Sequence, residues 1–186
     1  MELYDARARA LLAGTGSIVD AFTPPGYPAF LALIYAAGGG LRAVGAVHAV
    51  LGALTAALTF PVAWRLHRSR IGAGLASLLV ALHVPLVVYT GFVLTETLFA
   101  FLVVLWAWLA ILAHDRRSRG GTFMAALAGL TLGVAIAVRP NLALVLPLLA
   151  LVAWTRRRPG RRRAEAAAGH VPEPVRRPAG AEPPAA

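Results

Sequence analysis

The stretch Phe22-Thr23-Pro24-Pro25-Gly26-Tyr27-Pro28 lies between a charged amphipathic opening and a long series of apolar segments. Its three prolines lack the N–H that a helix interior needs, and each biases the preceding residue toward extended geometry. Gly26 permits a turn that a side chain would obstruct. We therefore expect a rigid loop at a membrane surface, with any chemistry on its side of the bilayer. The loop would shape a pocket through Pro24, Pro25, Gly26, Tyr27 and Pro28.

The composition is that of a membrane protein. The chain has 186 residues, of which 59% are apolar and 14% charged, and its mean hydropathy is +0.70. These values are too apolar for an ordinary soluble domain. The chain has no Cys, which excludes disulfides and thiolate metal sites. Its net charge of +10 comes from arginines that lie between apolar segments, so membrane topology explains them better than nucleic-acid binding.

Residues 1–40 are predicted to lie at the membrane surface. Residues 1–14 have the helical periodicity of an amphipathic helix, which the following glycines end. Tyr27–Ala37 forms a short apolar helix, which is too short to span a bilayer and is expected at the interface. Gly38-Gly39-Gly40 ends that helix.

Three apolar segments follow, and each ends at an arginine cluster. Arginines collect on the cytoplasmic side, so the two segments that begin and end at such clusters should be hairpins, turning near Gly91–Glu96 and at Arg139–Asn141. Gly129 and Gly133 form a small-xxx-small pair that predicts close helix packing. The fold class is therefore all-α, a polytopic transmembrane helical bundle integral to the plasma (inner) membrane. Its five crossings are approximately 41–64, 71–89, 95–113, 123–138 and 141–155, followed by a basic, Pro/Ala-rich disordered cytoplasmic tail, 156–186.

This topology places the amphipathic opening, the proline loop, Glu96 and the Arg139 turn together on the outer face. An outer N-terminus with no preceding crossing also predicts that the sequence begins inside a longer protein.

Most of the candidate functional residues allow two interpretations, one functional and one structural. Glu96 is either an acid facing a cavity or a first-turn carboxylate that complements the helix dipole, with Thr95 as cap. Arg139 binds a phosphate or a carboxylate such as Glu96, or else is a snorkelling interfacial arginine. Asn141 can cap the next helix. Glu2 and Asp5 are candidate general bases or part of a solvated helix face.

Taken together, four motifs resemble the N-terminal part of a GT-C glycosyltransferase, specifically of the bacterial family 39, protein-mannosyltransferase-like and RgtA/B/C/D-like group. They are Tyr4-Asp5 with Ala8-Arg9-Ala10-Leu11, Pro24-Pro25-Gly26-Tyr27-Pro28-Ala29-Phe30-Leu31-Ala32-Leu33, Leu94-Thr95-Glu96-Thr97-Leu98-Phe99, and Arg139-Pro140-Asn141. The resemblance covers roughly residues 2–155. Chains of that family continue through further crossings. We therefore expect this chain to be a fragment that is truncated at both ends and is inactive on its own.

The resemblance implies a membrane enzyme that transfers a hexosyl- or pentosyl-type sugar from a polyprenyl-phosphate-linked donor to a lipid, glycan or protein acceptor on the outer face. In that family an acidic residue just before the Tyr is the catalytic base. Here only Glu2 precedes Tyr4, and the matching aspartate would lie upstream of Met1, so Glu2 and Asp5 stand as substitutes. Glu96 matches the family's outer-face acid, and Arg139 and Asn141 match its donor-phosphate element.

The resemblance also implies a divalent metal ion as an optional cofactor, for which no residue is identified. The alternative is a non-catalytic polytopic membrane protein or a transporter-like subunit. No nucleic acid partner is expected, because only the arginine-rich tail suggests one.

Overall fold

The structure is a computed structural model that describes residues 2–16, 23–90, 92–115 and 119–157. All regular elements in these ranges are helices, which confirms the predicted fold class. In chain order they are α1 (Glu2–Leu12), α2 (Gly26–Ala36), α3 (Leu41–His67), α4 (Arg70–Ala81), α5 (Val84–Thr90), α6 (Thr95–Asp115), α7 (Arg119–Val138), the 3₁₀ helix η1 (Pro140–Leu144) and α8 (Val145–Arg157). The chain forms two compact units, Met1–Leu144 and Val145–Ala186, and α8 belongs to the second.

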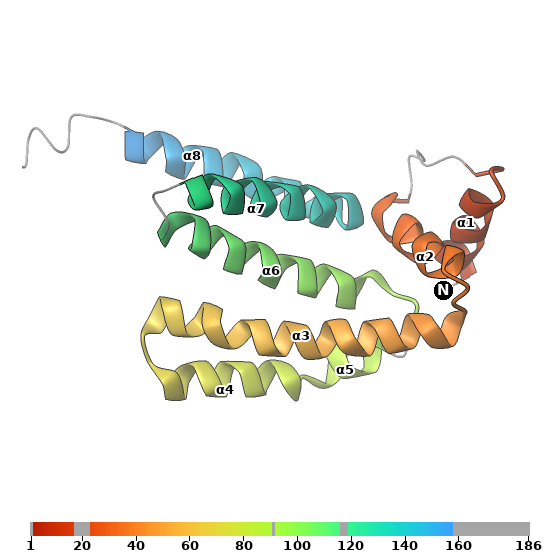
Figure 1. Ribbon diagram of the computed structural model, residues 1–186, viewed down its shortest axis with the longest axis horizontal. Coiled ribbons are helices and arrows are strands. Elements are labelled where there is room, and N and C mark those ends of the chain that lie inside the picture. The colour runs from red at the N-terminus through yellow and green to blue at the C-terminus, as the bar shows by residue number, and fades with distance from the viewer. Residues whose placement is uncertain (1, 17–22, 91, 116–118, 158–186) are drawn as a thin grey trace, which may run out of the picture. The chain divides into compact units, whose positions relative to one another are not determined.

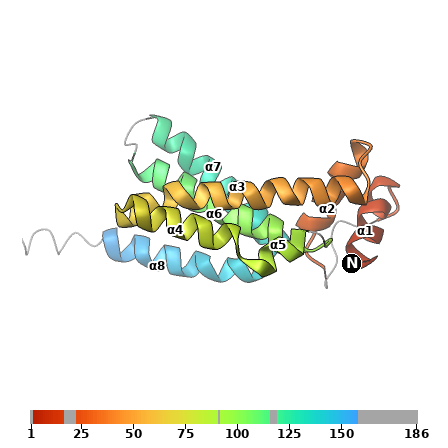
Figure 2. The same cartoon turned by 90° about the horizontal axis from the view of Figure 1, so that it is seen from below.

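The first unit is a helical bundle with two short helices at one end. Helices α4 and α5 lie along α3, while α6 packs between α3 and α7 (Figures 1 and 2). Helices α1 and α2 lie together at the end where α3 begins (Figures 1 and 2). Among the described residues, α3, α6 and Gly120–Val138 of α7 are long and apolar enough to cross a membrane.

The surface of this bundle is apolar. Ile71 and Leu79 of α4 are 79% and 71% exposed, and Leu130 of α7 is 66% exposed. Large contiguous apolar surfaces of this kind are rare on soluble monomers, but in a bilayer they face hydrocarbon as apolar as themselves.

The helices subdivide two of the ranges expected to be crossings. Residues 71–89 contain two helices, α4 and α5, because the chain breaks at Leu82 and His83 just before Pro85, whose ring favours the first turn of a new helix. Residues 141–155 likewise begin in η1 and continue in α8. The number of crossings and the compartment of each loop stay predictions. Arg116, Arg117 and the tail 158–186 lie outside the described residues.

The predicted loop is shorter than expected, because Gly26, Tyr27 and Pro28 form the first turn of α2. Proline is tolerated there, since first-turn N–H groups have no intrahelical partner. Gly26 was expected to permit a turn, but it instead allows α2 to approach the backbone of α7 closely. A Cβ at this position would lie 2.7 Å from Ala137 C and from Val138 N in the backbone of α7.

Glycine also ends α2, as predicted. Gly38 has φ +82°, and the N–H groups of Gly38 and Gly39 donate to Tyr35 O (2.9 Å) and Ile34 O (3.0 Å). These two bonds are the Schellman arrangement, which requires a left-handed residue that glycine adopts without strain. The turn allows α3 to begin within a few residues of the end of α2.

The core of the first unit joins α1 and α2 to the bundle. Tyr27 is fully buried, its ring meets the edge of Tyr4 at 5.1 Å between centroids, and its Oη lies 3.4 Å from His48 Nε2 on α3. The other buried apolar residues of this cluster come from five helices: Ala8, Leu31, Val44, Leu98, Leu102, Ala135 and Val138. This packing holds α1 and α2 against the ends of α3, α6 and α7, where the polar residues lie.

Candidate functional site

An open cleft of about 260 Å³ lies where four separate segments meet. Tyr4 comes from α1 and Pro24 from the residues before α2. The remaining lining residues come from the start of α6 and from the junction of α7 with η1: Leu94, Thr95, Glu96, Val138, Arg139, Pro140 and Asn141. These are the four segments that the sequence predicts to share one face of the membrane.

A carboxylate and a guanidinium pair inside this cleft. Arg139 Nη2 lies 3.3 Å from Glu96 Oε1, and the two side chains are 45% and 27% exposed. Thr95 Oγ1 donates to Glu96 Oε2 at 3.4 Å. The Arg139 guanidinium also lies over the Phe99 ring, 5.6 Å from its centroid. An ion pair this exposed contributes about 1 kcal/mol or less, so a more highly charged ligand can compete for the arginine.

The α6–α7 hairpin explains why the two charges meet. Glu96 lies in the first turn of α6, where the helix dipole favours an anion. Pro140 follows the end of α7 and disfavours helical geometry at the residue before it. Arg139 therefore makes the last helical bond, its N–H donating to Ala135 O at 2.9 Å, at the helix end that favours a cation. Because the two helices are antiparallel neighbours, these ends lie together.

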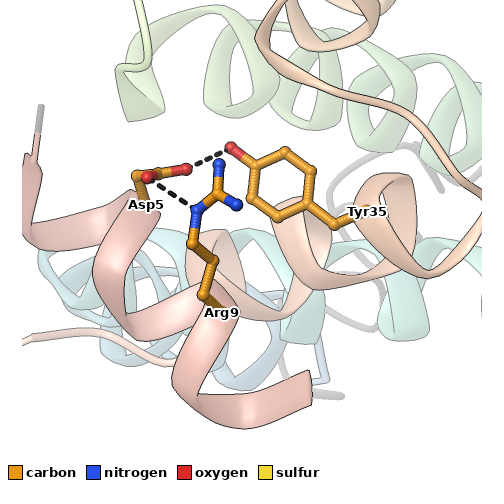
Figure 3. Close-up of polar contacts among 3 residues, drawn as sticks. All are labelled: Asp5, Arg9 and Tyr35. Carbon is orange, nitrogen blue, oxygen red and sulfur yellow. Dashed lines mark hydrogen bonds and ion pairs between the residues drawn. The ribbon is translucent and has the colours of Figure 1, made fainter. Parts of the chain in front are cut away.

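Asp5 lies outside this cleft and has other partners (Figure 3). Tyr35 Oη donates to its Oδ1 at 2.6 Å, and Arg9 Nε donates to its Oδ2 at 3.0 Å. The hydrogen bonds from Tyr35 and then from Arg9 hold the pKa of Asp5 below its usual value. Burial, reinforced by the bond to Asp5, raises the pKa of Tyr35 to about 12. A carboxylate of lowered pKa with both oxygens engaged is a weak general base, and this geometry favours a role in joining α1 to α2.

The structure also separates the other predicted residues. Among the described residues of the proline segment, Pro24 alone lines the cleft, whereas Tyr27 and Pro28 are buried in α2. The side chain of Glu2 lies outside the described residues. Thr95, which was predicted only as a helix cap, is the first residue of α6 and lines the cleft. Tyr4 also lines it, although the sequence suggested no separate role for Tyr4 beyond its place in the Tyr4-Asp5 motif.

Metal ligands do not gather at this site. Within the described ranges, no three His, Asp or Glu side chains come together in a way that could hold an ion. The optional divalent cation therefore has no ligand set in this part of the chain, and no step is assigned to it.

Helices of this length and hydropathy, with a charged pair at the ends of two of them, define a polytopic integral membrane protein. The chain belongs to the dolichyl-phosphate-mannose-protein mannosyltransferase family, whose model matches residues 5–158. It is therefore a membrane glycosyltransferase of the GT-C type, as the motifs indicate. No curated protein and no solved structure matches the chain.

Proposed function

We propose that the cleft around Glu96 and Arg139 binds a polyprenyl-phosphate-linked sugar and transfers the sugar to a hydroxyl of a lipid, glycan or protein acceptor on the outer face. The observation that carries this proposal is the pairing of Glu96 with Arg139 in an open cleft at the end of an apolar bundle. When the polyprenyl chain of the donor is in the bilayer, its phosphate lies at the membrane surface, where the end of a membrane-spanning bundle also lies.

Arg139 would bind the donor phosphate. A guanidinium offers a planar fork of N–H donors to phosphate oxygens, and charge-assisted bonds of this kind are the stronger ones. The Asn141 amide lines the same cleft and adds a neutral donor. During transfer the acceptor oxygen bonds to the anomeric carbon while the bond from that carbon to the phosphate oxygen breaks. Arg139 stabilises the negative charge that develops on the departing polyprenyl phosphate.

Glu96 would exchange partners when the donor binds. As the phosphate takes over Arg139, the carboxylate becomes available to orient the acceptor hydroxyl and to accept its proton. Asp5 is less suited to this step because Tyr35 and Arg9 already occupy it. Glu2 remains the other candidate base.

Arg139→Ala tests the phosphate assignment without knowledge of the sugar. The full chain in lipid nanodiscs is titrated with polyprenyl phosphate and with polyprenol of the same chain length. A charged hydrogen bond contributes about 1.5–3 kcal/mol, so the variant should lose about ten- to a hundredfold of the preference for the phosphate.

Arg65→Ala is the matched control. Arg65 pairs with Asp115 and its side chain is 47% exposed, much as Arg139 is, but the pair joins the last turns of α3 and α6. The Arg65→Ala variant should keep the full preference for polyprenyl phosphate over polyprenol. An unchanged preference in Arg139→Ala, or an equal loss in Arg65→Ala, would contradict the assignment.

Catalysis needs a separate measurement. Membranes that contain the protein are supplied with dolichyl-phosphate mannose, and mannose released from the lipid is followed. Release that depends on Glu96 supports the enzyme. Phosphate binding without release from this or any other polyprenyl-phosphate sugar would favour a non-catalytic or transporter-like role.

The outer face can be tested by cysteine labelling, because the natural chain has no Cys. An impermeant maleimide applied to intact cells should label Gly40→Cys, which precedes α3, and leave Ser118→Cys unlabelled. The opposite pattern would overturn the proposed orientation.

A further inference from the structure

Three exposed arginines gather where α3 ends and α4 begins. Arg65 lies in the last turn of α3, Arg68 follows that helix, and Arg70 is the first residue of α4. This turn lies at the opposite end of α3 from α1 and α2 (Figure 1). It is therefore separate from the Glu96–Arg139 cleft, and the proposed function assigns it no role.

Two of these three charges have no acidic partner. Arg65 pairs with Asp115 at the end of α6. Within the described ranges, no carboxylate lies at ion-pair distance from Arg68 or Arg70. Arg70 lies instead over an aromatic ring, with its guanidinium carbon 5.3 Å from the centroid of Trp64. A cation–π contact does not neutralise the guanidinium, so the turn keeps a net positive charge that an anion can bind.

The length of α3 places this turn among lipid headgroups. The helix has 27 residues, which at 1.5 Å per residue is about 40 Å. The hydrocarbon core of a bilayer is about 30 Å thick, and the bilayer with its headgroups about 40–45 Å. Trp64, in the last turn, is 39% exposed and is of a residue type enriched at the membrane–water interface. An anion at this level is most simply the phosphate of a lipid.

An apolar stripe leads away from the arginines along α4. Four large side chains recur at helical spacing on one face of this helix and are between 53% and 79% exposed: Ile71, Leu75, Leu78 and Leu79. Because the stripe begins next to Arg70, one ligand can place an anionic group at the turn and a hydrocarbon chain along the helix. A soluble anion would leave the stripe uncovered.

We propose that the α3–α4 turn is a binding site for an anionic glycerophospholipid such as phosphatidylglycerol. Its phosphate binds Arg68 and Arg70, and one acyl chain lies along the apolar stripe of α4. Guanidinium groups match phosphate oxygens in geometry and charge, and juxtamembrane arginines attract anionic headgroups. A zwitterionic lipid brings a cation of its own, which the arginines repel. The site does not depend on the proposed donor cleft or on the direction in which the bundle crosses the membrane.

Lipid selection tests the charge preference. The full chain is purified in detergent and given equimolar phosphatidylglycerol and phosphatidylcholine with the same acyl chains, and the ratio retained is measured by native mass spectrometry. Each arginine should contribute about fivefold, so the natural chain should retain phosphatidylglycerol about ten- to thirtyfold better. Arg70→Gln should lower this ratio about fivefold. Equal retention of the two lipids by the natural chain would overturn the proposal.

Arg68→Gly separates lipid binding from folding. Arg68 has φ +54°, a left-handed geometry that glycine adopts without strain. The variant should therefore keep its midpoint of thermal unfolding while the lipid ratio falls about fivefold. An unchanged ratio in Arg68→Gly or in Arg70→Gln would overturn the proposal.

Two control variants separate this site from net charge and from the donor cleft. Arg42→Gln removes an exposed arginine from the first turn of α3, at the other end of the helix, and should leave the ratio unchanged. Arg139→Ala should also leave it unchanged, because Arg139 lies in the cleft. A fall in either control as large as that in Arg70→Gln would overturn the site.

Fluorescence quenching then locates the lipid. Trp64 becomes the single tryptophan of the chain when Trp106, Trp108 and Trp154 are replaced by phenylalanine. In phosphatidylcholine nanodiscs, a small fraction of brominated phosphatidylglycerol should quench Trp64 more strongly than the same fraction of brominated phosphatidylcholine. Adding Arg68→Gly should remove most of this difference. Equal quenching by the two brominated lipids would overturn the proposed position.

Discussion

Replacing Gly26 by alanine should disturb the cleft through the end of α7, where Val138 lines it. A Cβ at Gly26 would lie 2.7 Å from Ala137 C and Val138 N and 2.8 Å from Ala137 O. All three are backbone atoms, which no side-chain rotation can move. Ordinary contact begins at 3.4 Å, so α2 and α7 would have to separate by about 0.7 Å. Arg139 follows Val138 directly, so the displacement reaches the pair with Glu96.

The expected magnitude follows from this overlap. Overpacking a well-packed site costs about 1–3 kcal/mol, and the gain in helix propensity from glycine to alanine returns about 0.5–1 kcal/mol. The free energy of unfolding should therefore fall by about 0–2.5 kcal/mol, centred near 1 kcal/mol. A displacement of about 0.7 Å at Arg139 is also expected to slow sugar transfer by about ten- to a hundredfold.

Gly133→Ala on α7 provides the matched control, since a Cβ there meets no atom of the described residues within 4 Å. It should gain about 0.5–1 kcal/mol, so the two variants should differ by about 2 kcal/mol. For a chain of this size that corresponds to midpoints of thermal unfolding roughly 4–8 °C apart. Equal midpoints for the two variants, with full transfer activity in Gly26→Ala, would refute the close packing of α2 on α7.

Three further changes test other parts of the structure. The lowered pKa of Asp5 means that its contribution to stability is present above its ordinary pKa, near 3.9, and is lost as the pH falls through the lowered value. Tyr35→Phe should therefore reduce the loss of stability below about pH 4, as followed by acid titration of the unfolding midpoint. Tyr27→Ala should destabilise the chain by about 3–5 kcal/mol in chemical unfolding, because it empties a fully buried site. Glu96→Gln should raise the affinity for polyprenyl phosphate by up to about fivefold, because it frees Arg139. The same variant should slow sugar transfer. A lower affinity together with slower transfer would contradict the exchange of partners.

The sequence was sufficient for the general class of fold. Hydropathy and arginine spacing predicted an all-helical membrane protein, and the apolar ranges match α3, α6 and α7. The end of α2 followed from local chemistry, since Gly38 adopts φ +82° just after the last turn. Its start did not, because the proline segment was predicted as a loop and Gly26, Tyr27 and Pro28 belong to the helix. Close helix packing at Gly129 and Gly133 is not found in the part of the chain that the structure describes, where no atom lies within 4 Å of a Cβ placed at either glycine.

Partners far apart in the sequence were harder to predict. The sequence suggested Glu96 as one possible partner of Arg139, but could not distinguish it from a phosphate until the hairpin gave a distance of 3.3 Å. Asp5 appeared available as a base because its partner Tyr35 lies 30 residues away.

Which segments are apolar enough for a bilayer, and which few charges lie among them, can be read along the chain because these properties depend on each residue and its near neighbours. The pairing of Arg139 with Glu96, the hydrogen bond from Tyr35 to Asp5 and the approach of Gly26 to α7 became visible when the helices were packed together. The physical reason is that a pair's energy depends on a separation of a few ångströms, which chain packing sets and local composition does not encode.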